Sequence, residues 1–119
     1  MLNDATCFKN VFLVCGYTDL RSGIDHLAGI IETQTGSKPF VPDTLYLFCG
    51  RRTDRVKGLV WENDGYLLLY KRLAEGQFQW PRNAAEVRLL TSQQFRWLME
   101  GLTMAPKKSV KQVSPEYVA

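Results

Sequence analysis

Two segments of strand composition flank a turn sequence in the middle of the chain. Val56 to Glu62 and Tyr66 to Arg72 are rich in apolar, β-branched and aromatic residues, and they enclose Asn63-Asp64-Gly65. An Asp-Gly pair accepts the positive φ angles that tight hairpin turns require. The pattern therefore predicts an antiparallel β-hairpin with Asp64-Gly65 at its tip, which commits the centre of the chain to a sheet.

Shorter apolar runs on either side of the hairpin predict further strands. Val11 to Cys15 and Leu45 to Cys49 are continuous apolar runs, and a glycine follows each of them. Runs of this length and composition are typical of buried strands. Gln77 to Trp80 alternates polar and apolar residues before Pro81, which predicts a third antiparallel strand beside the hairpin.

Two stretches have the periodicity of amphipathic helices. The first has a capping arrangement of Ser22 and Asp25 and a stop at Gly36, and its apolar stripe consists of Ile24, Leu27, Ala28 and Ile31. The second begins with a capping box of Thr91 and Gln94, and its stripe consists of Phe95, Leu98, Met99 and Leu102. Both stripes need a surface to cover, so we expect an α+β fold: a mainly antiparallel sheet with a central β-hairpin and two principal amphipathic helices.

The length of the chain suits one domain. Its 119 residues can build one core but not two ordinary ones, and 45% of them are hydrophobic. We expect a single globular domain over residues 1–104 and a flexible basic tail over 105–119, where lysines and prolines occur without periodicity. No apolar run approaches the roughly 20 residues that cross a bilayer, and no signal-peptide pattern opens the chain. A cytoplasmic protein without a membrane partner is therefore expected.

The residue types that usually carry catalysis or bind metals are scattered along the sequence. Cys7, Cys15 and Cys49 form no CxxC pair and His26 is the single histidine, so the common zinc ligand sets are missing. Cys15 and Cys49 end apolar runs and are expected to be buried. The acidic residues stand in turns and near helix starts, where they have structural roles. We therefore expect no catalytic site, no metal site and no cofactor.

Positive charge is concentrated, although the net charge is only +3. Residues 51–57 hold four cations against one carboxylate, and phosphates need several such donors converging on one surface. A two- or three-residue hairpin turn would place Lys57 opposite Arg72 or Lys71, at the open end of the hairpin. The sequence therefore predicts a DNA-binding ridge made of Arg51, Arg52, Arg55, Lys57, Lys71 and Arg72.

Aromatic residues accompany these cations. Trp61, Tyr66 and Tyr70 belong to the hairpin, and such rings either stack on unpaired bases or pack against a neighbouring helix. Core packing is the favoured interpretation for Trp61, as it is for Trp80 and Trp97, whereas both interpretations stay open for the two tyrosines.

Three stretches of the sequence resemble one family of mobile-element proteins. They are VCGYTDLRSGID (14–25), LFCGRRTDRVKGLVWENDGYLLLYKRLAEGQFQWPR (47–82) and LTSQQFRWLMEGL (90–102). Together they are similar to the small accessory protein, TnpB or Orf2-like, of insertion-sequence family sixty-six. The family commonly has a further basic residue where this chain has Thr53, and often a lysine where it has Ser22. The resemblance implies a role in moving an insertion sequence beside a separate, larger transposase that carries the catalytic acids.

These observations lead to a main hypothesis and two alternatives. The main hypothesis is a non-catalytic accessory protein that binds DNA at the ends of the insertion sequence and helps the transposase engage them. The first alternative is a protein adaptor that binds the transposase or another accessory protein of the element without contacting DNA. A nuclease is the third and weakest interpretation, because the carboxylates are dispersed.

Overall fold

The computed structural model of the protein describes residues 2, 7–82 and 86–101. The elements of the described part follow one another as β1 (Asn10–Val14), α1 (Ile24–Thr35), β2 (Thr44–Cys49), β3 (Arg55–Trp61), β4 (Tyr66–Arg72), β5 (Val87–Leu90) and α2 (Ser92–Met99). The predicted tail over 105–119, and Leu102 of the second helical stripe, lie outside the described residues. None of the helices described is both long enough and apolar enough to span a membrane.

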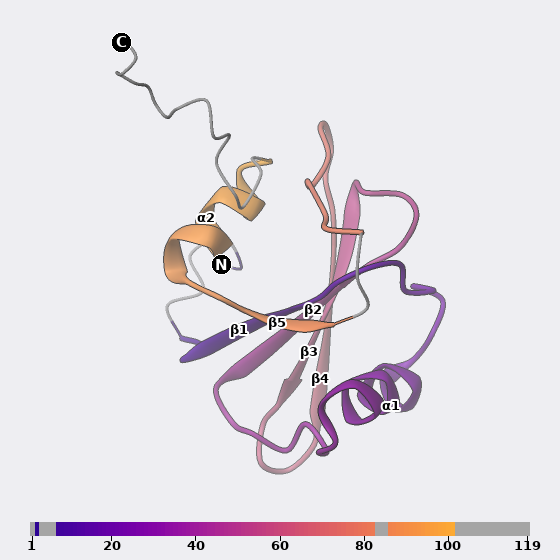
Figure 1. The fold of residues 1–119 in the computed structure, drawn as a ribbon, viewed down its shortest axis with the longest axis vertical. Helices are drawn as coiled ribbons and strands as arrows, with labels where there is room; N and C mark the ends of the chain where they lie inside the picture. Colours follow the sequence, from indigo (N-terminus) through magenta and orange to yellow (C-terminus); the bar gives the residue numbers. More distant parts are fainter. Residues whose placement is uncertain (1, 3–6, 83–85, 102–119) are drawn as a thin grey trace, which may run out of the picture.

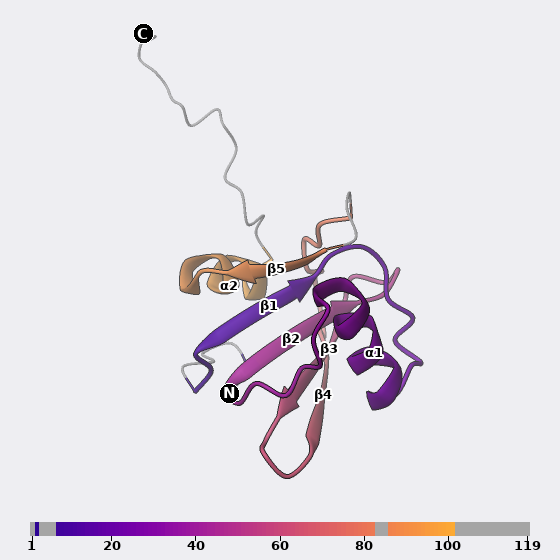
Figure 2. The same ribbon diagram turned by 60° about the horizontal axis from the view of Figure 1, so that its bottom comes forward.

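The strands form one five-stranded sheet in the order β4-β3-β2-β1-β5. β1 and β2 are parallel and are connected through α1, whereas the other three strand pairs are antiparallel. Figures 1 and 2 show α1 on one face of this sheet and α2 on the other. The α+β fold with a mainly antiparallel sheet, predicted from the sequence, is confirmed.

Each face of the sheet is covered by one helix and has its own apolar cluster. Leu27 and Ile31 of α1 pack with Phe48 of β2 and Leu59 of β3 on one face. On the other face, α2 contributes Phe95, Leu98 and Met99 to a cluster that also contains Leu47, Val56, Phe78 and Trp80. β2 lies in the middle of the sheet and is buried along its whole length, which explains why its sequence is continuously apolar.

The start of α1 differs from the sequence prediction. The N-cap residue is Gly23, which has no side chain to form a capping hydrogen bond, and not Ser22. The Ser22 hydroxyl instead lies 2.5 Å from Nδ1 of His26, one helical turn further on. Asp25 does stand in the first turn, where a negative charge complements the helix dipole. The predicted stop is confirmed, because Gly36 caps the helix at φ 80°.

The capping box predicted for α2 is present. The Thr91 hydroxyl accepts a hydrogen bond from the Gln94 backbone N–H at 3.0 Å, and the Gln94 side chain accepts one from the Thr91 N–H at 2.9 Å. Phe95, Leu98 and Met99 are buried, as their spacing predicts. The capping box therefore defines where this short helix begins, and the spacing of its apolar residues defines which side of it is buried.

The hairpin is confirmed, but its register is shifted from the predicted one. The Glu62 N–H donates to the Gly65 carbonyl, so Asn63 and Asp64 form the tip. Asn63 takes the positive φ angle of 75° that was expected of the Asp-Gly pair. Lys57 consequently lies opposite Tyr70, and the prediction that it faces Arg72 or Lys71 is wrong.

Residues 77–80 do not form the predicted third antiparallel strand. The segment lies outside the strands, but its alternation is real, because Phe78 and Trp80 are buried while Gln77 and Gln79 are exposed. Its backbone forms single hydrogen bonds to loop residues and not a strand ladder. For example, the Phe78 N–H donates to the Thr53 carbonyl at 2.7 Å. β5, which the sequence pattern did not predict, takes the place beside β1 instead.

The three thiols differ in their access to solvent, which gives a first prediction. Cys15 and Cys49 are buried, as predicted, and Cys7 is exposed. Burial raises the pKa of the Cys49 thiol to about 11 and also raises that of Cys15. Because the thiolate is the reactive form, a thiol reagent at pH 8 should rapidly label one group per native chain and three after unfolding. Fast labelling of two or more groups in the native protein would contradict the buried positions.

Candidate nucleic-acid interface

A groove of about 840 Å³ opens at the end of the sheet where β3 begins and β4 ends. Two loops form part of its wall: residues 17–21 follow β1, and residues 50–52 follow β2. The outer strands complete it with side chains of β3 and β4. Its lining contains five cationic side chains, Arg21, Arg51, Arg52, Arg55 and Lys57, and one carboxylate, Asp19. The groove is therefore a strongly positive surface.

Strand alternation decides which of the predicted residues share this groove. Arg55 and Arg72 are directly paired across β3 and β4, so both lie on the face of the sheet that α1 covers. Lys71 is paired with Val56, whose side chain belongs to the cluster on the α2 face. The structure thus gathers four of the six predicted cations, Arg51, Arg52, Arg55 and Lys57, around one groove. Arg72 is exposed on the same face of the sheet, and Lys71 is on the opposite face.

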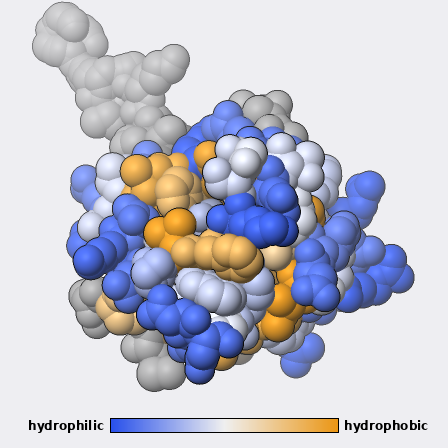
Figure 3. Space-filling view, turned by 90° about the horizontal axis from the view of Figure 1, so that it is seen from below, coloured by the Kyte–Doolittle hydropathy of each residue, from blue (hydrophilic) through white to orange (hydrophobic). Residues whose placement is uncertain are grey.

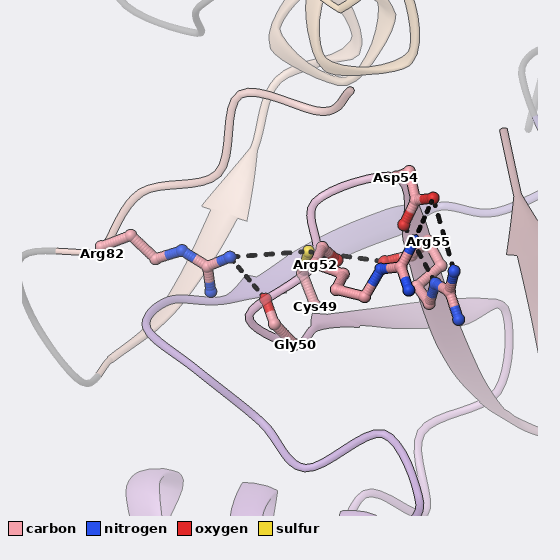
Figure 4. A network of polar contacts seen from close by, with 6 residues as sticks. All are labelled: Cys49, Gly50, Arg52, Asp54, Arg55 and Arg82. Carbon is pink, nitrogen blue, oxygen red and sulfur yellow. Dashed lines mark hydrogen bonds and ion pairs between the residues drawn. The ribbon is translucent and has the colours of Figure 1, made fainter. Parts of the chain in front are cut away.

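Asp54 organises two of the groove arginines. Its carboxylate accepts a hydrogen bond from Nε of Arg55 at 2.9 Å and lies 3.8 Å from the Arg52 guanidinium (Figure 4). The hydrogen bond from Arg55 lowers the pKa of Asp54, so this carboxylate stays ionised near neutral pH. Arg55 is mostly enclosed, with its side chain 22% exposed, whereas that of Arg52 is 73% exposed. Arg52 is therefore the more accessible donor of the two.

A compact turn forms another part of the groove wall. Asp19 accepts hydrogen bonds from the Arg21 backbone N–H at 3.0 Å and from its guanidinium at 2.9 Å. The hydrogen bond from the Arg21 side chain lowers the pKa of Asp19 to about 2. Lys57 reaches across from β3 and donates to the Ser22 carbonyl at 3.3 Å, so the loop before α1 is tied to the sheet.

Arg82 joins the two loops behind the groove, and sequence reasoning did not identify it. Its guanidinium donates to the Gly16 carbonyl at 2.8 Å and, in a short contact, to the carbonyl of Gly50. Figure 4 shows the guanidinium directed at Gly50 and at the sulfur of Cys49. Arg82 follows Pro81 and the buried Trp80, but nothing in that local pattern indicates which loops it contacts.

Tyr17 is the second residue of the site that the sequence did not reveal. Its ring is 59% exposed, and the guanidinium carbons of Arg82 and Arg51 lie 4.0 and 5.0 Å from the ring centroid. Tyr70, whose role was left open, is 55% exposed and lines the same groove. The only sequence signal for Tyr17 is its position directly after Gly16, where β1 gives way to a loop.

A separate aromatic cluster lies at the other end of the hairpin. The Trp61 ring centroid is 4.6 Å from that of Phe40 and 5.0 Å from that of Tyr66. Trp61 is thus half-buried against a loop residue and a residue of the neighbouring strand, and it is not one of the buried core residues. Phe40 and Val41 are 50% and 48% exposed. Figure 3 shows a short hydrophobic band bordered by hydrophilic side chains on the face at the bottom of Figure 1.

The groove offers cations and aromatic faces, and no cluster of metal ligands is found in the described part of the chain. No three described His, Cys, Asp or Glu side chains gather closely enough to hold a metal ion. Asp19 in the groove and Asp54 beside it are each bonded to an arginine. Guanidinium groups suit phosphate oxygens, and exposed aromatic rings suit the faces of bases.

Comparison with known proteins connects this fold to a family. The chain is 28% identical over 92 residues to "Uncharacterized protein y4hO" of Sinorhizobium fredii, an alignment that covers 77% of this chain and 79% of that protein. It is 27% identical over 95 residues to "Uncharacterized protein y4jC" of the same organism, with 78% and 80% covered. No solved structure matches the chain. The family model described as "IS66 Orf2 like protein" matches residues 9–109, and the chain therefore belongs to this family.

Proposed function

We propose that the protein is a non-catalytic accessory factor in the transposition of an insertion sequence, and that it binds DNA through the basic groove. The family supports the setting in transposition. One observation carries the DNA-binding part: Arg51, Arg52, Arg55 and Lys57 converge on a single groove although they come from a loop and a strand. In this role the protein would hold DNA at the ends of the element for the separate transposase.

The individual cations would contribute in different ways. Arg51 and Arg52 are exposed in the loop after β2 and can turn toward phosphates with little loss of existing contacts. Arg55 is bonded to Asp54, which holds its guanidinium at the wall of the groove, where its charge would act on phosphates together with those of Arg51 and Arg52. Arg72 extends the positive surface along β4, and Lys71 would act only from the opposite face of the sheet.

Salt dependence provides the decisive test of this proposal. If four groove cations neutralise phosphates, log affinity should fall with log salt at a slope of about −3.6 on duplex DNA. The variant Arg51→Gln, Arg52→Gln, Arg55→Gln should flatten the slope to about −0.9, because each phosphate ligand accounts for about one unit. Fluorescence anisotropy with a labelled duplex at several salt concentrations measures both slopes.

A matched variant controls for the loss of three positive charges. Lys9→Gln, Lys38→Gln, Arg96→Gln removes the same net charge from exposed positions outside the groove. It should keep a slope close to that of the unmodified protein, since distant charges are largely screened. Equal slopes for both triple variants would remove the groove from DNA binding, and no binding even at low salt would reject DNA binding as the function.

The adaptor is the second candidate function, and the aromatic end of the hairpin favours it. Phe40 and Val41 expose apolar surface beside Trp61, and such surface is enriched where proteins dock. The proposed occupant is the transposase, the larger protein of the same element. Co-purification with the transposase that survives nuclease treatment and is lost in Phe40→Gln would establish this function. Co-purification abolished by nuclease would instead leave DNA as the link.

A further inference from the structure

Two tyrosine rings stand exposed within the basic groove. Tyr17 and Tyr70 are 59% and 55% exposed and both line the groove, although they come from a loop and from β4. Aromatic rings at this exposure forgo the burial that normally stabilises them. Phosphate binding alone does not require them, because the cations supply it. Their presence therefore calls for a ligand with a flat apolar face as well as negative charge.

The Tyr17 ring is held in position before any ligand arrives. Arg82 lies 4.0 Å from the ring centroid, and its guanidinium is in turn bonded to the carbonyls of Gly16 and Gly50. Arg51, 5.0 Å from the same centroid, is exposed and belongs to a loop. A flat ligand can therefore take the position near the ring that Arg51 occupies, while the Arg51 guanidinium turns to a phosphate. A preorganised ring lowers the entropy cost of stacking.

The Tyr70 ring is fixed by the sheet. It lies opposite Lys57 in the β3–β4 ladder, and a hydrogen bond links Tyr70 to the Arg55 side chain. Each tyrosine thus has a cation as an immediate neighbour. Alternating rings and cations along one groove is the arrangement by which proteins bind unpaired nucleic-acid strands.

We propose that the groove binds single-stranded DNA in preference to duplex DNA, with bases stacked on Tyr17 and Tyr70 and phosphates bound by Arg51 and Arg52. This inference rests on the proposed DNA-binding function and specifies its substrate. In a duplex the base faces are covered by their neighbours, so only an unpaired strand gains the stacking contacts. The groove of about 840 Å³ lies within the range of roughly 300–1,000 Å³ that accommodates ligands the size of one or a few nucleotides.

The test compares strands and rings at one salt concentration. A labelled 20-nucleotide DNA strand without self-complementarity, the corresponding duplex and the RNA strand of the same sequence are titrated with the full-length protein. We expect the DNA strand to bind at least about tenfold more tightly than the duplex. Tyr17→Leu and Tyr70→Leu should each weaken strand binding by about tenfold and leave duplex binding within about twofold. Tyr17→Phe keeps the ring and should retain the preference.

Control variants separate this inference from the proposed function. Phe40→Leu removes a similarly exposed ring from the loop that packs on Trp61, away from the groove, and should leave strand binding unchanged. Equal affinities for strand and duplex, with no effect of either tyrosine variant, would overturn the stacking inference while the DNA-binding function stands. Tighter binding of the RNA strand would overturn the assignment to DNA. No binding of any probe at low salt would overturn both proposals.

Discussion

Replacing Trp80 by alanine is expected to lower the free energy of unfolding by about 3–5 kcal/mol, the largest effect of any single change considered. The indole is only 7% exposed and belongs to the cluster beneath α2. Its N–H also donates to the Val14 carbonyl at 3.0 Å, which ties the segment after β4 to β1. Alanine removes both the buried ring and this hydrogen bond.

Two comparisons separate those contributions. Trp80→Phe keeps a buried ring but leaves the Val14 carbonyl without its donor, so a smaller loss of about 1–3 kcal/mol is expected. Leu89→Ala, on β5, truncates a side chain that is 55% exposed and should change stability by less than about 1 kcal/mol. Urea unfolding followed by circular dichroism measures all three. A loss below about 1 kcal/mol for Trp80→Ala would mean that residues 77–82 are not part of the cooperative core.

The elements predictable from sequence are those whose signal is local. The stripe of α2 and its Thr91–Gln94 capping box lie within one short stretch, and the structure reproduces both. The hairpin was also predicted from its local turn sequence, but its tip residues and its register were not. Asn, Asp and Gly can each adopt positive φ, and the structure places it at Asn63, which shifts every pair along β3 and β4.

Non-local pairing explains the errors in the sheet. Phe78 and Trp80 alternate with exposed residues as in a strand, but alternation reports which side chains are buried and not whether the backbone has a ladder partner. β5 spans only Val87–Leu90, too short for a periodic signal, and pairs with β1 more than 70 residues earlier. No local pattern could have predicted that partner.

The residues of the candidate site also divide into those with a local sequence signal and those brought in by non-local pairing. Arg51, Arg52, Arg55 and Lys57 are close together in sequence, so their shared surface could be predicted from charge alone. Tyr17 reaches the groove only because β1 and β2 are parallel neighbours whose following loops meet. The contact between these two loops follows from the sheet topology, and no local sequence pattern indicates it.

Arg82→Met is expected to lower the free energy of unfolding by about 2–3 kcal/mol and to weaken DNA binding without changing its salt dependence. Arg82 donates to the carbonyls of Gly16 and Gly50, and hydrogen bonds from a charged donor contribute about 1.5–3 kcal/mol each, part of which water recovers. Methionine retains the apolar stem but cannot hold the two loops together. Tyr17 would then lose the guanidinium 4.0 Å from its ring centroid, and the groove would lose its fixed wall.

The salt dependence distinguishes this supporting role from direct contact with DNA. If Arg82 neutralised a phosphate, Arg82→Met would flatten the log-affinity against log-salt slope by about one unit. Because its guanidinium is directed at carbonyls, we expect an unchanged slope with a lower affinity. Arg82→Lys keeps the charge, but a single ammonium group cannot reproduce the planar fork that bridges both loops, so it should restore little of the lost stability. Full recovery in Arg82→Lys, or a flattened slope in Arg82→Met, would show that Arg82 acts through its charge and not by joining the loops.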